Sequence, residues 1–328
     1  MSKPNRWYDS TKSHHTPTGF TNPDISQRDP GALKRWREER KAQGLPRPPG
    51  EGYEAFVRQW WQKADFSGDE DAVWWLGHAC LLLRVGGQHI LCDPALGQRA
   101  SPLPFAGPLR KTPLAATIAE LPNIDWVLYS HNHYDHLDRG TLRRLLKRFP
   151  ALRVAAPLGM GAWLRRHGVK HVAECDWWDA LTAPAFALHC TPARHWSMRS
   201  LWDRNRSLWC GWVVSTPRWR FFFSGDSGYT PRLAEIGQRL GPFDAAALPI
   251  GAYAPEWFMA ESHMSPTEAV RFYQELQQPR VIPIHWGVFE LADESLDEPP
   301  RELLRAQREA GVNNADFAAL KIGGKITL

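Results

Sequence analysis

Short runs of apolar residues, each of strand length, dominate the chain from about residue 72 onwards. The first three runs occupy residues 73–76, 80–85 and 89–92. Gly86 and Gly87 separate the last two runs, and a pair of glycines between apolar segments is typical of a tight hairpin turn. The pattern therefore predicts a set of paired strands at the start of the main part of the chain.

Helical patterns follow these strands. Residues 141–149 carry Leu142, Leu145 and Leu146 on one face of an expected amphipathic helix. The other expected elements are a hairpin of strands 209–215 and 219–223, a helix over 233–240, a strand over 245–250 and a helix over 266–276. Two halves that each run from strands to a helix match an α+β fold with αββα sandwich architecture, in which two mixed sheets lie between outer helices.

Residues 1–50 differ from the rest because they are rich in proline, glycine and charge, with one helical candidate at residues 28–41. We expect an extended arm that is partly mobile or wrapped on the domain and has no core of its own. Its basic residues are interpreted as a solvated helix face rather than as a phosphate-binding site. Residues 51–328 then form the main domain.

Composition fits one large folded unit and narrows the range of partners. Hydrophobic residues make up 43% of the 328 residues, and the net charge of +5 is too mild to indicate nucleic acid. The five cysteines lack a C-x-x-C pattern and favour buried free thiols. The first residues contain no apolar signal region and no run reaches transmembrane length, so we expect a cytoplasmic protein.

Candidate chemistry is concentrated in residues 130–138, which directly follow an apolar run of strand length. This stretch holds His131, His133, Asp135 and His136 within six residues. Imidazole and carboxylate groups are the ligands that zinc and similar divalent metals prefer. A strand end followed by a tight loop can direct alternate ligands to two neighbouring points. The spacing therefore suits two metals better than one.

His195, Asp226 and His285 occur in the same context, because each is the first histidine or aspartate after a buried-type strand. Asp226 lies within Ser-Gly-Asp-Ser-Gly, whose glycines allow the backbone to approach closely. Taken singly, each position has an ordinary structural explanation as a capped or hydrogen-bonded polar residue. Taken with residues 130–138, they predict a metal site at one edge of the two sheets.

These residues occur in the order of the five motifs of the metallo-β-lactamase superfamily, which the chain resembles over about residues 15–328. The motifs are Asp93 after an early strand, the His-x-His-x-Asp-His cluster, His195, Asp226 and His285. Within the superfamily, the chain most resembles the branch of N-acylphosphatidylethanolamine-hydrolysing phospholipase D and its bacterial relatives. The stretches that carry this second resemblance are 75–79, 131–138, 192–196, 203–209, 224–229 and 284–287.

The resemblance implies seven ligands for two zinc ions. One ion would be bound by His131, His133 and His195, the other by Asp135, His136 and His285, with Asp226 bridging both. A water molecule between the two ions would become hydroxide near neutral pH and attack an electrophilic phosphorus or carbonyl carbon. No serine or cysteine nucleophile is needed.

The resemblance also implies a supporting set of residues around the ligands. Asp93, and with it Asp138 and His78, would orient the ligand loop through hydrogen bonds from outside the metal site. His263 aligns with an active-site histidine of the phospholipase branch, although it also lies next to a plausible helix start at Ser265. We therefore expect Asp135, Asp226 and His263 to act in catalysis.

Candidate substrate-binding residues cluster around His195. They are Arg194, Trp196, Arg199, Arg204 and Arg206. Guanidinium groups suit phosphate, and tryptophan gives apolar or interfacial surface. The apolar loop 101–111 with its basic edge, together with 17 tryptophans, leaves contact with an acyl chain or a membrane surface open. The alternative is that the aromatic residues form core and the arginines form ordinary surface pairs.

The resemblance implies a zinc-dependent phosphodiesterase that cleaves an N-acylphosphatidylethanolamine-like phospholipid into N-acylethanolamine and phosphatidic acid. Alternatives are a lactonase or carboxylic ester hydrolase, a nuclease, and a metal-binding scaffold without turnover. The lack of a recognisable RNA-binding domain argues against nuclease activity, and the complete ligand set argues against a metal-binding scaffold without turnover. β-Lactam hydrolysis is not implied, because the flanking motifs belong to other branches. Oligomeric state and the native metal stay open.

Overall fold

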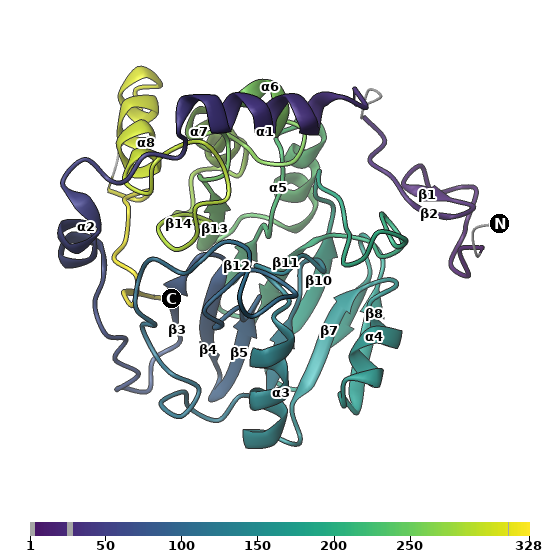
Figure 1. The fold of residues 1–328 in the computed structure, drawn as a ribbon. Helices are drawn as coiled ribbons and strands as arrows, with labels where there is room; N and C mark the ends of the chain where they lie inside the picture. Colours follow the sequence, from purple (N-terminus) through teal and green to yellow (C-terminus); the bar gives the residue numbers. More distant parts are fainter. Residues whose placement is uncertain (1–3, 25–28, 314) are drawn as a thin grey trace.

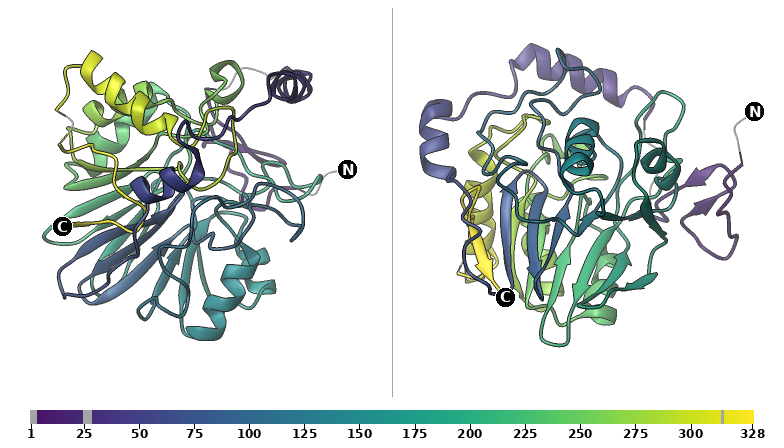
Figure 2. Two further views of the ribbon diagram at one scale, coloured as in Figure 1. Left: turned by 60° about the vertical axis from the view of Figure 1, so that its left-hand side comes forward. Right: turned by 90° about the horizontal axis from the view of Figure 1, so that it is seen from below.

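The computed structural model describes residues 4–24, 29–313 and 315–328. Two β-sheets face each other at the centre, and helices cover the outer face of each sheet (Figure 1; Figure 2). In the left view of Figure 2 the teal helices α3 and α4 lie on one side, and the green and yellow helices lie on the other. These outer helices are α3 (Arg139–Arg148), α4 (Gly161–Arg166), α5 (Ala234–Leu240), α7 (Pro266–Glu275) and α8 (Glu298–Glu309). The predicted αββα sandwich is confirmed.

The first sheet has seven strands in the order β15-β3-β4-β5-β6-β7-β8. The strands from β15 to β5 pair antiparallel and those from β5 to β8 pair parallel, so the sheet is mixed. Gly86 and Gly87 form the predicted hairpin turn, with φ of 54° and 79°. The strands are β3 (Ala72–Gly77), β4 (Cys80–Val85), β5 (Gln88–Cys92), β6 (Trp126–Leu128), β7 (Arg153–Pro157), β8 (His171–Cys175) and β15 (Lys325–Thr327).

The second sheet has six strands in the order β14-β13-β12-β11-β10-β9. The predicted hairpin around residues 216–218 joins β11 to β12, while β12, β13 and β14 run parallel. A 3₁₀ turn, Pro231–Leu233, precedes α5. The strands are β9 (Ala180–Thr182), β10 (Ala187–Thr191), β11 (Gly211–Ser215), β12 (Arg220–Phe223), β13 (Ala245–Pro249) and β14 (Arg280–Ile284).

Strand direction brings the candidate ligands together. Strands β3, β5 and β6 run in one direction in the first sheet, and β10, β12 and β14 share a direction in the second. The carboxyl ends of each set therefore meet at one edge of their sheet. Every candidate ligand lies in a loop that begins at one of these ends. A hydrogen bond from His285 N–H to the carbonyl of His78 (3.0 Å) joins the two edges.

The described part of the N-terminal arm packs on the domain at several places (Figure 1). Its elements are β1 (His15–Thr16), β2 (Gly19–Phe20) and α1 (Ala32–Gln43), and α1 lies beside α6 (Glu256–Met259). The helix α2 (Gly52–Trp60) follows at the start of the main domain. His14 Nε2 and His15 Nε2 lie 2.7 and 3.0 Å from the carboxylate of Asp176, which follows β8. Trp36 of α1 stacks on Phe258 of α6, with ring centroids 4.9 Å apart.

Aromatic side chains are among the largest fully buried groups of the core. Trp74, Trp75, Trp209 and Trp212 are fully buried, so these tryptophans belong to the core and not to a lipid interface. All five cysteines are buried and free, as predicted. Among the described residues, no helix combines the length and the apolar character needed to cross a bilayer.

Phe222 of β12 offers a test of this core. It is 1% exposed and its ring packs against Phe243 and Phe272, at centroid distances of 5.6 and 6.0 Å. Replacement of Phe222 with Ala should lower the free energy of unfolding by about 3–5 kcal/mol, because it removes apolar contacts and leaves a cavity. Urea denaturation measures this change. Phe105→Ala, at a 76% exposed position, is the control and should change the value by less than about 0.5 kcal/mol.

Candidate metal centre

Three histidines form the first group of candidate ligands. His131 and His133 come from the loop after β6, and His195 comes from the loop after β10. His133 Nδ1 lies 2.8 Å from His131 Nε2 and 3.1 Å from His195 Nε2. The structure thus brings together the three residues predicted for the first zinc ion, with their ring nitrogens directed at one another.

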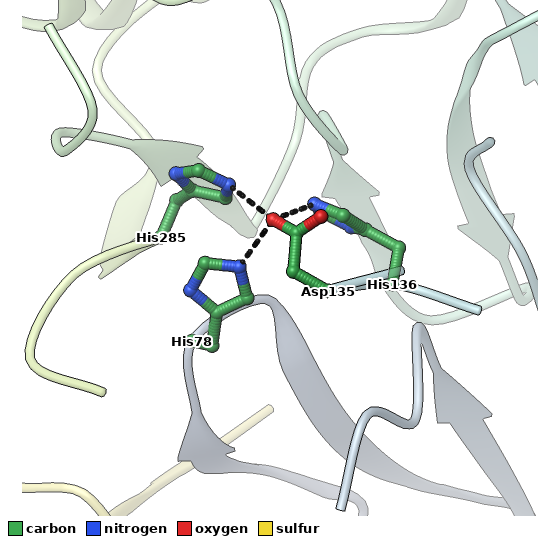
Figure 3. Close-up of side chains that lie close together, drawn as sticks. All are labelled: His78, Asp135, His136 and His285. Atoms are coloured by element: carbon green, nitrogen blue, oxygen red, sulfur yellow. Dashed lines mark hydrogen bonds and ion pairs between the residues drawn. The ribbon is translucent and has the colours of Figure 1, made fainter. Parts of the chain in front are cut away.

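The second group contains Asp135, His136 and His285, and Figure 3 shows how their side chains converge. Asp135 Oδ2 lies 3.3 Å from His136 Nε2 and 3.4 Å from His285 Nε2. His78 completes the group, because its Nε2 lies 2.9 Å from the same oxygen and its ring lies 4.1 Å from that of His285. The sequence predicted His78 as a supporting residue, and its imidazole contacts Asp135 directly.

Asp226 lies between the two groups. Its Oδ2 is 3.0 Å from His136 Nε2 and from His285 Nε2, and 3.7 Å from His195 Nε2. The preceding Gly225 has φ of 60°, and a Cβ there would lie 2.5 Å from the Cβ of Ser130. Only glycine fits both the backbone angle and the space, so Gly225 allows the loop of Asp226 to pack directly on the first ligand loop.

Asp93 holds the ligand loop from behind, as predicted from its position after β5. It is fully buried, and its carboxylate accepts a hydrogen bond from Ser130 N–H (2.7 Å) and lies 2.7 Å from His136 Nδ1. The hydroxyl of Ser130 donates to Asp93 Oδ2, the oxygen that His136 also contacts, and lies 2.9 Å from His131 Nδ1. These contacts fix two histidine rings so that their Nε2 atoms point toward Asp226.

Asp138 is placed differently from the prediction. Its carboxylate accepts hydrogen bonds from the N–H groups of Gly140 and Thr141 at 2.9 and 3.1 Å, and so caps the N-terminus of α3. The supporting role predicted for Asp138 toward the ligand histidines is therefore corrected to that of a helix cap. The cap still fixes where the ligand loop ends, because the loop leads directly into α3.

His263 also reaches the cluster. Its Nδ1 lies 3.9 Å from Asp226 Oδ2, and its ring lies 5.1 Å from the rings of both His195 and His285. The carbonyl of the neighbouring Ser262 lies 2.8 Å from His195 Nδ1. Ser265 begins α7 with a reciprocal capping box, so the helix start and the active-site position predicted for this segment occur together.

The donor atoms of the cluster fit divalent metal ions. Two of them, His133 Nε2 and Asp226 Oδ1, are buried without a hydrogen-bond partner among the described residues. Burial lowers the pKa of His133 and of His195 to about 3, which keeps both rings in the neutral form that binds metal. Burial alone would raise the pKa of Asp226, but His136 and His285 hold it well below its usual range.

A cavity of about 450 Å³ opens beside the cluster. His133, Asp135, Asp226 and His263 reach its wall. Most of the remaining wall is apolar, and includes Trp196, Met198, Leu201, Met259 and Leu291. The arrangement places a candidate metal site against an apolar compartment open to solvent.

A family model described as "Beta-lactamase superfamily domain" matches residues 88–286, which is more than half of the chain. The chain belongs to the metallo-β-lactamase superfamily. Igni18, a metallo hydrolase of Ignicoccus hospitalis, has a similar structure with a TM-score of 0.58 and 19% identity, over 79% of this chain and 98% of that chain. At this level of identity the likeness concerns the fold.

Within the superfamily, the chain belongs to the branch of N-acylphosphatidylethanolamine-hydrolysing phospholipase D. It is 35% identical over 261 residues to N-acyl-phosphatidylethanolamine-hydrolyzing phospholipase D 1 of Caenorhabditis elegans, a match that covers 76% of this chain and 73% of the relative. It is also 35% identical to the mitochondrial N-acyl-phosphatidylethanolamine-hydrolyzing phospholipase D of Saccharomyces cerevisiae, over 70% of this chain and 50% of the relative. The chain thus spans half the length of the yeast relative.

The residues predicted to bind substrate do not all lie at the cavity beside the candidate ligands. Trp196 lines the cavity, with its ring 4.2 Å from that of His133, and the guanidinium of Arg204 lies over Trp196 at 4.6 Å. Arg199 also lines the cavity, but its Nη1 donates to the carbonyls of Asn132 and Leu137 at 2.7 and 2.8 Å. Arg199 therefore supports the ligand loop as well as facing the cavity.

Arg194 does not face the cluster. Its guanidinium donates to the carbonyl of Tyr229 (2.9 Å), and the side chain lines a separate cavity of about 230 Å³ between the N-terminal arm and the domain. Arg194 therefore does not line the cavity beside the candidate ligands, where substrate contact was predicted. Arg206 lies in the same loop as Arg204, where its N–H donates to the carbonyl of Asp203 (3.0 Å).

Asn22 of the arm is a site residue that the sequence analysis missed. It is 7% exposed, and its Nδ2 donates to the carbonyl of His195 at 2.6 Å. Its Oδ1 accepts from the N–H of His195 (3.2 Å) and from Trp209 Nε1 (3.0 Å). The arm thereby fixes the backbone of a candidate ligand. No local signal marks Asn22, because its partner is 173 positions away in the sequence.

Replacement of Asn22 with Ala should weaken zinc binding about 10- to 100-fold, because the backbone of His195 loses its support. Competition with a chromophoric chelator measures the dissociation constant. Asn5→Ala is the matched control, because Asn5 bonds to the carbonyls of Thr16 and Gly19 within the same arm and does not contact His195. Equal zinc affinity in the Asn22 variant and the wild type would contradict a positioning role.

Proposed function

We propose that this metallo-hydrolase is a di-zinc phosphodiesterase that cleaves an N-acylphosphatidylethanolamine-like phospholipid. The observation that carries the proposal is the apolar cavity that opens directly onto the candidate ligands. A phosphodiester at the cluster would leave acyl chains beside Trp196, Met198 and Met259. The names of the nematode and yeast relatives favour the same substrate class.

We propose that two metal ions bind here and that both ligand groups share Asp226. His131, His133 and His195 would hold one ion, and Asp135, His136 and His285 would hold the other. When bound, two such ions would lower the pKa of water to near neutrality and stabilise the negative charge that develops on the phosphoryl oxygens. His78 would hold Asp135 in place through the 2.9 Å contact with its carboxylate.

The chain itself would orient the substrate and handle its proton. His263 reaches the cavity wall next to Asp226, where its imidazole can form a hydrogen bond to a phosphoryl oxygen or to the leaving oxygen. Trp196 packs on His133 and, with Arg204 over its outer face, forms an amphiphilic wall for the lipid. The apolar wall limits the access of bulk water to the reacting phosphate.

We include membrane contact in the proposal, with a cytoplasmic location at the membrane surface. Two loops beside the cavities present large apolar side chains to solvent. Phe105 is 76% exposed in one loop, and Leu201 and Trp202 are 85% and 86% exposed in the other. Exposed apolar residues of this size that border a binding cavity suit insertion among lipid headgroups.

The activity is tested by incubation of the zinc-loaded protein with N-acylphosphatidylethanolamine in mixed micelles, with mass spectrometry of the products. We expect N-acylethanolamine and phosphatidic acid. Asp226→Ala should lower the rate more than about 100-fold and reduce the zinc content, because Asp226 contacts both ligand groups. Lack of release by the zinc-replete wild type would refute the lipid substrate and direct attention to lactones and smaller esters.

Membrane contact has its own test. Replacement of both Leu201 and Trp202 with Ser should weaken binding to phosphatidylcholine–phosphatidylglycerol vesicles about tenfold or more, because each side chain loses apolar burial. Cosedimentation measures the partition. The control is Leu304→Ser at a 42% exposed position of α8, on a different part of the surface. Equal partition of both variants would contradict docking through this loop.

A further inference from the structure

A second and larger cavity, of about 810 Å³, adjoins the apolar cavity at the cluster. The two share Pro102, Tyr134, Arg199 and Ser200 in their walls, so they form adjoining compartments of one recess. Tyr134 lies between the candidate ligands His133 and Asp135 in sequence, and its hydroxyl donates to the carbonyl of Arg199 (2.6 Å). The boundary between the compartments is therefore built from the metal loop itself.

The larger compartment is basic where the smaller one is apolar. Four arginines line it, Arg99, Arg139, Arg144 and Arg199, against two aspartates, Asp138 and Asp203. This leaves an excess of two positive charges. Both carboxylates already accept hydrogen bonds from backbone N–H groups. Asp138 accepts from the first turn of α3, and Asp203 accepts from the N–H groups of Arg199 and Ser200. The compartment therefore attracts anions.

Not all of these arginines are committed to the fold. Arg99 donates to the carbonyl of Gly107, and Arg199 donates to the ligand loop. Arg144 makes two contacts at 3.4 Å within its own helix. The side chain of Arg139 makes no hydrogen bond or ion pair with any residue in the described ranges 4–24, 29–313 and 315–328.

Arg139 also occupies a position where its positive charge does not stabilise helix α3. It is the first residue of α3, and the first turn of this helix has no acidic residue. A cation at a helix N-terminus meets the positive end of the helix dipole, which is unfavourable, and the cap carboxylate of Asp138 is already bonded to backbone N–H groups. Because Arg139 lines the cavity, an anionic ligand there would offset this repulsion.

We propose that the larger compartment binds a second anionic group of the substrate, a carboxylate or phosphate located beyond the scissile phosphodiester. This inference rests on the proposed function and narrows its substrate class. N-Acylation removes the positive charge of the ethanolamine amine, so N-acylphosphatidylethanolamine carries only the negative charge of its phosphodiester. The preferred substrate is instead a phosphodiester lipid with an additional anion in its polar part.

A matched pair of lipids tests this preference, because N-acylphosphatidylserine differs from N-acylphosphatidylethanolamine by one carboxylate. The zinc-loaded wild type should cleave the serine lipid with a kcat/KM about tenfold higher, as expected for a charge-assisted contact. In R139Q/R144Q this preference should disappear through a higher KM for the serine lipid. The rate on the ethanolamine lipid should stay unchanged.

The control is R143Q/K147Q, which removes two positive charges from the same helix at exposed positions that do not line the compartment. This variant should keep the preference of the wild type, and loss of the preference here would show that general charge on α3 is responsible. Equal kcat/KM values of the wild type for both lipids would overturn the inference and leave the phosphodiesterase proposal standing.

If the wild type cleaves neither lipid, the proposed function is refuted. The second anion site would then be tested by lipid binding alone. In micelle titrations followed by tryptophan fluorescence, the wild type should bind the serine lipid at least about fivefold more tightly than the ethanolamine lipid. R139Q/R144Q should bind both lipids equally. Equal binding of the two lipids by the wild type would overturn the inference.

Discussion

The buried carboxylate of Asp226 is the constraint around which the rest of the site is arranged. It is 2% exposed, and an ionised carboxylate in such a place costs several kcal/mol unless cations or hydrogen-bond donors compensate. His136 and His285 provide this compensation at 3.0 Å, and bound metal ions would provide more. Loops from both sheets must therefore reach one point. This requirement explains why the strands that carry ligands share a direction and why a residue without a side chain, Gly225, precedes Asp226.

Support for the cluster comes from three separate parts of the chain. Asp93 holds the loop of the first sheet, the carbonyl of Ser262 lies against the ring of His195, and Asn22 of the arm holds the backbone of that residue. The arm is in turn tied to the domain through Asp176, whose carboxylate contacts both His14 and His15. The N-terminal segment is thus a structural part of the candidate site, although none of its residues within 4–24 and 29–50 is a candidate ligand of the cluster.

The distribution of apolar and basic side chains divides the recess next to the cluster. Apolar residues surround the compartment that contains the candidate ligands, and arginines surround the neighbouring one. Several large aromatic residues serve a different purpose, because Trp74, Trp75 and Trp212 are fully buried in the core. Trp202, at the tip of a loop beside both compartments, is exposed to solvent. Exposure and position, rather than the number of tryptophans, therefore define the surface that we propose to contact lipid.

The sequence by itself determined the fold class, the hairpins and most strands that precede the ligands, because apolar runs, turn glycines and ligand chemistry are local properties. It did not identify the short elements between residues 153 and 182, among which the edge strands β8 and β9 are only partly buried. Nor could it tell that Arg194 faces away from the cluster, that Asp138 caps a helix, or that Asn22 meets His195. Those outcomes depend on contacts between residues far apart in sequence and on the direction of side chains in loops. Only the packing of the two sheets and the arm decided them.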